Sequence, residues 1–163
     1  ESLMKNEIIK KIIISFVIVL FIFFIDRITK ILILNIAETG KVDIYVNSFL
    51  NLYLVWNNGI GFGLLSFDDV YIYNSITVLI VLINLIIVYL IYIEKGLKSY
   101  FLIGILGGSL GNLFDRLYYN AVPDFIDLNY NGFHWFIFNV ADIFITLGII
   151  CLIFIEIIKY KKN

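Results

Sequence analysis

The sequence predicts an all-α integral membrane protein with four transmembrane helices and a small β-sheet in the first loop on the outer side of the membrane. Of the 163 residues, 61% are hydrophobic and 15% are charged, whereas about a quarter of the residues in soluble domains are charged. Four apolar segments are each long enough to cross about 30 Å of hydrocarbon. After the first segment, residues 42–56 are rich in β-branched and aromatic side chains, which is typical of strands.

Four apolar stretches are predicted to be the helices: residues 8–36, 71–93, 100–118 and 136–158. We expect the whole chain, residues 1–163, to form a single membrane domain in which residues 37–70 and 119–135 are outer loops. Residues 1–3 precede the only methionine and are expected to be the remnant of an expression tag. The first apolar run is not followed by a small-residue cleavage site, so we expect it to remain as a helix.

The basic residues indicate how the helices are oriented. Eight of the twelve lie before or at the start of the first helix, between the second and third, or after the fourth: Lys5, Lys10, Lys11, Lys95, Lys98, Lys159, Lys161 and Lys162. Positive residues accumulate on the cytoplasmic side of membrane proteins. Both termini are therefore expected in the cytoplasm, and the two longer loops on the outer side.

The two outer loops show different strand signals. In the first loop, leucines at 50, 52 and 54 alternate with other residues, which is the periodicity of a strand. In the second loop, Asn131-Gly132 predicts a two-residue hairpin. If residues 130 and 133 face each other, Asp124 lies opposite Asn139 and close to Asp142, although a slip of one residue would change this register.

Composition disfavours several functional classes. The net charge of −1 is unlike that of nucleic-acid-binding proteins, which carry a basic face. The single cysteine, Cys151, lies in an apolar run, and the single histidine, His134, lies beside a tryptophan in an outer loop. Zinc chemistry and histidine-based triads are therefore poorly supported, and neither a metal site nor a cofactor is expected.

Ionisable residues at membrane depth need a partner or a function, because an unpaired charge there is costly. Asp26 and Lys30 lie four residues apart on one face of the first helix, where they form a structural ion pair or support a nearby site. On the third helix, Asn112 shares a face with Asp115 and Arg116. The glycine pairs 104/108 and 107/111 of that helix favour close helix packing.

Two further aspartates lie near the outer face. Asp124 follows the only proline and is flanked by apolar residues, so desolvation is expected to raise its pKa; a polar turn is the alternative interpretation. Asp142 opens the fourth helix, three residues after Asn139. The effect of the helix N-terminus, about 0.3–1 kcal/mol, is too small to account for an acid at this depth. Asp127 is expected to be a structural hydrogen-bond acceptor.

Two neighbouring carboxyl groups share one proton, because both cannot ionise readily. The ionised member can take a proton from water while the protonated member polarises a carbonyl, which hydrolyses a peptide. Four polar residues are candidates to hold the substrate and stabilise developing charge: Asn57, Asn112, Asn139 and Arg116. A proton-coupled transporter or channel is the alternative, but it predicts acids spaced through the bilayer. A non-catalytic assembly subunit would leave the acids unexplained.

Five motifs together resemble those of the lipoprotein signal peptidases, or signal peptidase II, a family of bacterial membrane aspartyl proteases. In chain order they are residues 26–30 (DRITK), 57–62 (NNGIGF), 107–116 (GGSLGNLFDR), 122–127 (VPDFID) and 138–142 (FNVAD). The resemblance extends over essentially the whole chain. Two positions depart from the family pattern: Gly61 replaces the usual alanine or serine, and Phe136 replaces a common proline.

The resemblance implies that Asp124 and Asp142 are the catalytic dyad. It also implies site roles for Asn57, Gly59, Asn112, Arg116 and Asn139, with Asp26, Lys30, Asp115 and Asp127 in support. The implied substrate is a prolipoprotein cleaved before a cysteine that carries a diacylglyceryl group. The implied location is the bacterial cytoplasmic (inner) membrane, with the active site at its outer face. Membrane lipid and globomycin-type inhibitors are the other expected partners, nucleic acid is not one, and a monomer is expected.

Overall fold

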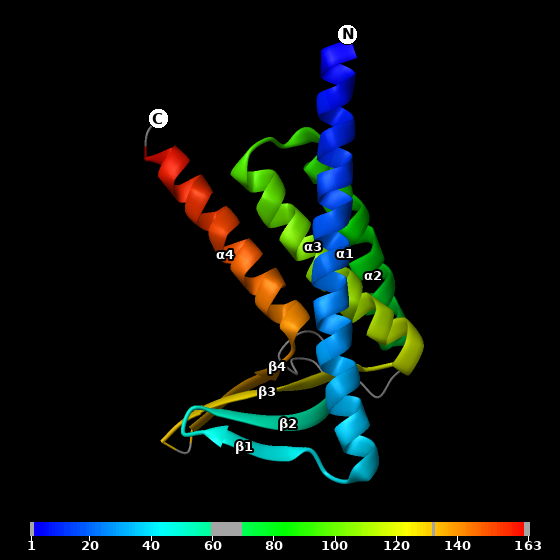
Figure 1. The fold of residues 1–163 in the computed structure, drawn as a ribbon, viewed down its shortest axis with the longest axis vertical. Coiled ribbons are helices and arrows are strands. Elements are labelled where there is room, and N and C mark those ends of the chain that lie inside the picture. The colour runs from blue at the N-terminus through cyan, green and yellow to red at the C-terminus, as the bar shows by residue number, and fades with distance from the viewer. Residues whose placement is uncertain (1, 60–69, 132, 162–163) are drawn as a thin grey trace.

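The computed structural model describes residues 2–59, 70–131 and 133–161, with side chains from residue 6 onward. The helices are α1 (Ser2–Thr39), α2 (Val70–Ile93), α3 (Leu97–Tyr119) and α4 (Val140–Tyr160). The strands are β1 (Asp43–Asn47), β2 (Leu50–Asn57), β3 (Val122–Tyr130) and β4 (Phe133–Phe138). Figure 1 shows the helices gathered into one bundle, with the sheet lying across one end and both chain termini at the other.

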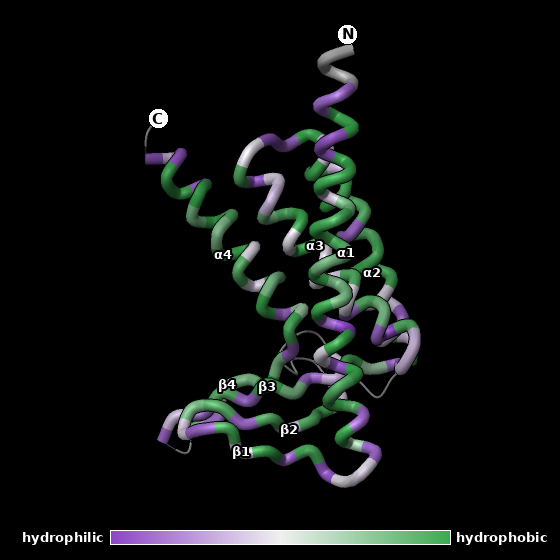
Figure 2. Tube along the Cα trace, viewed as in Figure 1, coloured by the Kyte–Doolittle hydropathy of each residue, from purple (hydrophilic) through white to green (hydrophobic). Residues whose placement is uncertain are grey.

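The prediction of four membrane-spanning helices is confirmed. Within the described ranges, four helices are long and apolar enough to cross a membrane. Most of the side chains that they expose are apolar, and Figure 2 shows most of the length of α2 in the green of hydrophobic residues. A soluble protein rarely exposes so much apolar surface, whereas lipid solvates it.

Helix α3 is the centre of the bundle, because α1, α2 and α4 all pack against it. Its glycines face two different helices. A Cβ at Gly107 would lie 2.9 Å from Ile22 of α1, and a Cβ at Gly108 would lie 2.5 Å from the Ala141 carbonyl oxygen of α4. Of the predicted 104/108 pair, Gly108 allows close packing but Gly104 does not, because a Cβ at Gly104 would meet nothing within 4 Å. Spacing alone identified the small residues but not their partners.

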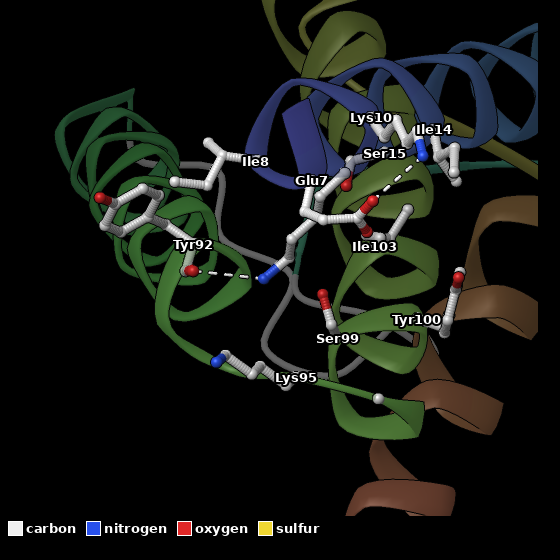
Figure 3. A pocket seen from close by; sticks show the side chains of 12 residues that line it. Glu7, Ile8, Lys10, Ile14, Ser15, Tyr92, Lys95, Ser99, Tyr100 and Ile103 are labelled. Atoms are coloured by element: carbon white, nitrogen blue, oxygen red, sulfur yellow. Dashed lines mark hydrogen bonds and ion pairs between the residues drawn. The ribbon is translucent and has the colours of Figure 1, made fainter. Parts of the chain in front are cut away.

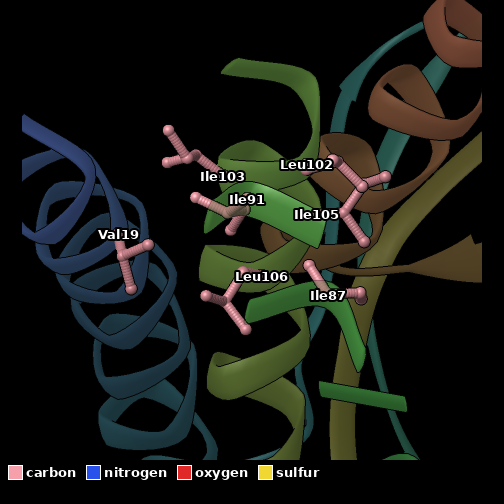
Figure 4. Close-up of a cluster of buried hydrophobic side chains, with 7 residues drawn as sticks. All are labelled: Val19, Ile87, Ile91, Leu102, Ile103, Ile105 and Leu106. Atoms are coloured by element: carbon pink, nitrogen blue, oxygen red, sulfur yellow. The ribbon is translucent and has the colours of Figure 1, made fainter. Parts of the chain in front are cut away.

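Helix α1 turns one narrow stripe towards α3. Apart from Arg27, its buried side chains recur every three or four residues, which is the period of one helix face; they are Val19, Ile22, Asp26, Lys30 and Ile33. The upper part of this stripe belongs to an apolar cluster shared by α1, α2 and α3, which Figure 4 shows. The lower part is charged and faces the polar part of α3.

The sheet is larger than expected, because half of it comes from the second connection. The strand order in the described chain is β1-β2-β3-β4, and every pair is antiparallel. The hairpin predicted around Asn131 is therefore part of the same sheet. The predicted start of the fourth helix at residue 136 is also wrong: residues 133–138 form strand β4, and α4 begins at Val140. Short apolar runs fit either structure, and the helix start is set by the cap at Asn139.

The predicted hairpin register is correct at the turn and slips before it reaches the site. Tyr130 pairs with Phe133, as expected, and Asn131 has the positive φ of 50° that such a turn requires. An irregularity between Asp127 and Asn129 then shifts the pairing by one residue. Three residues singled out in the sequence lie outside the described ranges: Gly61, Gly132 and Lys162.

Candidate active site

Asp124 lies on β3, the strand that passes beneath the helices. Val55 of β2 is its direct cross-strand neighbour, and Asn57 is two residues further along β2. Residues two apart on a strand share a face, so the Asn57 side chain reaches Asp124 diagonally. Its Nδ2 donates to Asp124 Oδ2 at 2.9 Å, while its Oδ1 accepts from the Gly59 amide at 2.8 Å. The Asn57 amide is thus held in one orientation.

Asp142 lies in the first turn of α4, where it completes a capping box. Asn139 is the N-cap, and its Oδ1 accepts from the Asp142 amide at 3.1 Å. In return, the Asn139 amide donates to Asp142 Oδ2 at 3.1 Å. The other carboxyl oxygen, Oδ1, accepts from Asn112 Nδ2 at 2.8 Å. Both oxygens of Asp142 are therefore fixed by amides from two different helix positions.

Asn139 joins the two aspartates directly. Besides capping α4, it donates from Nδ2 to Asp124 Oδ1 at 2.6 Å. Asn139 is completely buried, and Asp124 and Asp142 are 2% and 8% exposed. The Asn139 side chain therefore contacts the carboxyl group of Asp124 on the sheet and the backbone amide of Asp142 on α4.

The environment of Asp124 favours its protonated form. Burial is the main cause and the nearby Asp142 charge is the second; together they raise the pKa of Asp124 to about 7, against the lowering effect of the asparagine hydrogen bonds. The two residues are neighbours in the site, because Asn139 contacts both of them. Near neutral pH, such a pair holds about one proton.

A buried network of charges lies behind Asp142. Lys30 Nζ donates to Asp26 Oδ2, Asn112 Oδ1 and Asp115 Oδ2 at 2.8, 2.8 and 2.6 Å, which uses all three of its hydrogens. Asp26, Lys30 and Asp115 are completely buried. Asp26 Oδ1 also accepts from the Ala141 amide of α4 at 3.0 Å. The network links α1, α3 and α4 and fixes the amide of Asn112 that holds Asp142.

Arg27 is a member of this network that the sequence interpretation did not select. Its Nη1 lies 2.6 Å from Asp115 Oδ1, and its guanidinium lies 4.9 Å from the centre of the Phe114 ring. Arg27 and Lys30 together neutralise the two acids of the network, Asp26 and Asp115. In the sequence, Arg27 could have been identified as a member of the network because it adjoins Asp26 at the same depth in the membrane as the other charges.

Arg116 lies on α3 next to α2 and is almost completely buried. Its guanidinium stacks on the Tyr73 ring at 5.0 Å, and its carbonyl accepts from the Tyr73 hydroxyl at 3.1 Å. It is close enough to Asp124 for their charges to interact. Its Nη1 is buried and has no hydrogen-bond partner within the part of the chain that the structure describes. A buried donor without a partner favours an acceptor supplied by a ligand. Nothing in the sequence singled out Tyr73.

Asp127 is not brought to the aspartate pair. Its Oδ2 accepts from Asn51 Nδ2 of β2 at 3.5 Å and lies 2.8 Å from His134 Nδ1 of β4. It therefore ties together three strands of the sheet, and His134 is mostly exposed on the sheet rather than next to Asp124.

An apolar cavity of about 350 Å³ opens beside Asp142, between the β3–β4 hairpin and α4. Its walls include Leu128, Trp135, Phe138 and Leu147, and Asp142 lies among them. The site therefore combines a carboxyl pair, fixed amides and an apolar surface, which suits hydrolysis of a substrate that carries an apolar group.

The comparisons with known proteins agree with this geometry. The family model of signal peptidase (SPase) II matches residues 18–158. The chain is 53% identical to the lipoprotein signal peptidase of Pelagibacter ubique over 91% of this chain and 90% of that protein. It is 40% identical to that of Anaplasma phagocytophilum, over 94% and 97% of the two chains.

A solved bacterial membrane enzyme superposes with a TM-score of 0.73 at 34% identity, over 91% of this chain and 90% of that chain. The likeness therefore extends over about nine-tenths of both chains. The chain belongs to the signal peptidase II family and is a multi-pass bacterial membrane enzyme of the aspartic peptidase class.

Proposed function

We propose that Asp124 and Asp142 are the catalytic residues, and that they cleave the signal peptide from a diacylglyceryl-modified prolipoprotein. The observation that carries this proposal is the contact of one buried asparagine, Asn139, with both aspartates. It is supported by the raised pKa of Asp124, which lets the pair hold a single proton near neutral pH.

In the proposed reaction, the ionised carboxylate takes a proton from water, and the water oxygen bonds to the scissile carbonyl carbon. The protonated carboxyl group donates its proton to the carbonyl oxygen. As the C–N bond breaks, the carboxyl group that took the proton from water donates it to the leaving amine. A hydroxyl of the tetrahedral diol gives its proton to the other carboxylate, so the pair ends with the same one proton. Acid–base catalysis of this kind contributes about 10²–10⁴-fold in rate.

The lipid on the substrate accounts for the apolar cavity at Asp142. A diacylglyceryl chain stays in the membrane, and the signal peptide is itself an apolar helix. Either can lie against the cavity beside Asp142, because the walls of the cavity are largely apolar. We propose that the cavity accepts an apolar part of the substrate and thereby brings the modified cysteine to the aspartate pair.

We propose that Arg116, Asn57 and Gly59 bind the substrate backbone, and that Asn112 and the charged network behind it hold Asp142 in place. The free Nη1 of Arg116 is suited to a substrate carbonyl or to negative charge that develops on it. Asn57 and Gly59 lie together at the end of β2, where their backbone can approach an extended peptide. Asn112 holds Asp142, with Lys30, Asp26 and Asp115 supporting it from behind.

We also propose that the sheet lies at the outer face of the bacterial inner membrane and that both termini are cytoplasmic. Lysines concentrate at the end of the bundle remote from the sheet, as the positive-inside rule requires. C-terminal fusions test this orientation: a fluorescent protein should be active there and alkaline phosphatase inactive. The opposite pattern would reverse the orientation.

Binding of globomycin-type cyclic peptides and activity as a monomer follow from the same proposal. A globomycin-type inhibitor should compete with substrate, because it would occupy the same cavity and aspartate pair. Size-exclusion chromatography with light scattering should give the mass of one chain in detergent at the concentration used for the assay.

The substrate proposal is tested with one prolipoprotein in two forms, with and without the diacylglyceryl group on its cysteine. Purified protein in detergent should cleave the modified form directly before the cysteine and leave the unmodified form almost intact. EDTA should not alter the rate. Equal cleavage of both forms would refute the requirement for lipid, and inhibition by EDTA would refute the metal-free reaction.

A further inference from the structure

A second cavity lies at the end of the bundle remote from the sheet, far from the aspartate pair. It has a volume of about 660 Å³ and lies between the first turns of α1, the end of α2 and the start of α3. Figure 3 shows side chains from α1 and α3 facing each other across it. Nothing in the peptidase reaction requires a cavity at this end.

The rim of this cavity is positively charged. Its lining residues include Lys10, Lys11 and Lys95 and one acid, Glu7. Lys10 pairs with Glu7 at 3.0 Å in an exposed position. Lys11 donates to the Tyr92 and Glu94 carbonyl oxygens at 3.2 and 2.5 Å and so caps the end of α2. Lys95 forms no ion pair with any described residue, so it is available to an anion.

Two further features point to a ligand that accepts hydrogen bonds. Helix α3 begins at the cavity with Gly96 as its N-cap; no side chain caps it, and its first turn contains no acid. A helix N-terminus without such partners favours an anion. In addition, the hydroxyl of Ser15 lines the cavity and is buried, with no hydrogen-bond partner in the described chain. Buried hydroxyls are normally satisfied.

The remaining walls are apolar and open towards lipid. Ile8 and Ile14 of α1 line the cavity and are 43% and 45% exposed. Tyr92 and Tyr100, also half-exposed or more, stand at the same level, where tyrosines mark the boundary between headgroups and hydrocarbon. A free anion would gain nothing from these apolar walls, whereas a lipid would cover them.

We propose that this cavity binds an anionic phospholipid of the leaflet opposite the sheet. The headgroup phosphate lies between Lys10, Lys95 and the start of α3, and the acyl chains follow the outward isoleucines of α1. Basic pockets between transmembrane helices commonly bind phosphate headgroups in this way. The lipid fills the space between α1 and the α2–α3 corner, and so fastens the first helix to the bundle.

The test uses the full chain in detergent and measures bound lipid by native mass spectrometry and Tm by thermal unfolding. Dioleoyl-phosphatidylglycerol should remain bound and raise Tm, and dioleoyl-phosphatidylcholine should do neither. In the double variant Lys10→Gln/Lys95→Gln, phosphatidylglycerol affinity should fall about 25-fold, from about fivefold for each lysine near a membrane surface. The matched control is Lys159→Gln/Lys161→Gln, which removes the same charge at the end of α4 and should bind as the wild type does.

Each other outcome overturns the proposal. Equal effects of the two lipids would show that the headgroup is not recognised. An equal loss of phosphatidylglycerol affinity in the two double variants would show that binding depends on net charge and not on this cavity. A Tm rise with glycerol 3-phosphate equal to that with phosphatidylglycerol would show that the occupant is a free phosphate. Cleavage of prolipoprotein in detergent by Lys10→Gln/Lys95→Gln should stay at the wild-type rate, so failure of the lipid site leaves the peptidase assignment intact.

Discussion

Replacement of Gly108 by alanine tests whether close contact between α3 and α4 positions the aspartate pair. The added Cβ would lie 2.5 Å from the carbonyl oxygen of Ala141, the residue before Asp142. The obstacle is backbone, so it cannot rotate away as a side chain could. Ordinary contact begins at about 3.4 Å, which requires the two helices to separate by about 0.9 Å locally.

That displacement acts directly on the hydrogen bond between Asn112 and Asp142. The bond is 2.8 Å long, and an added 0.9 Å would stretch it to about 3.7 Å, beyond hydrogen-bonding distance. Overpacking costs typically about 1–3 kcal/mol, which corresponds to roughly 2–4 °C in Tm for each kcal/mol in a chain of this size. A catalytic group misplaced by about 1 Å can cost about 100-fold in rate.

The assay measures kcat/KM for cleavage of a fluorogenic diacylglyceryl lipopeptide together with Tm in the same detergent. Gly104→Ala is the matched control, because it lies one turn away on α3 and its Cβ would meet nothing within 4 Å. It should keep full activity, and its helix should gain about 0.5–1 kcal/mol. The reasoning is refuted if Gly108→Ala keeps wild-type activity and Tm, or if both variants lose activity equally.

Three further results are expected. Because burial and the charge of Asp142 raise the pKa of Asp124 to about 7, kcat/KM should fall about tenfold per pH unit above that value as the shared proton is lost; a flat profile from pH 6 to 9 would contradict this. That pKa lies above the ordinary 3.8, so the stabilising contribution of Asp124 should be complete below about pH 4 and disappear as the pH rises to about 7, which Tm measured against pH will show as a slope that Asp124→Asn lacks. Lys30→Met should lower the free energy of unfolding by about 3–5 kcal/mol, because Asp26 and Asp115 would keep buried charges without their shared partner; an unchanged Tm would show that the network carries little stability.

The helices were predictable because a segment that crosses the membrane must be long enough to span the hydrocarbon and apolar enough to be surrounded by lipid. The start of α4 was not, since the apolar run of β4 fits a strand as well as a helix. What separates the two elements is Asn139, whose side chain and backbone complete a capping box with Asp142. The spacing of these two residues was visible in the sequence, but the box that they form was not used to place the helix boundary.

The site depended on contacts that no local pattern contains. The hairpin turn correctly placed Asp124 near the start of α4, and the register then shifted by one residue at an irregularity in β3. The contacts of Lys30 with Asn112 and Asp115, and the pairing of Arg27 with Asp115, join residues more than eighty positions apart. Only the packing of α1 against α3 makes these contacts, so the sequence could pair Asp26 with Lys30 but could not connect either residue with α3.

The central claim is that Asp124 and Asp142 act as one catalytic pair, and single-turnover cleavage of diacylglyceryl-modified prolipoprotein by Asp124→Asn and Asp142→Asn tests it most directly. Each variant should bind the substrate and retain a cooperative thermal transition, but should cleave at least about 100-fold more slowly than the wild type, because each removes one half of the proton transfer. Cleavage by either variant at close to the wild-type rate would contradict the account.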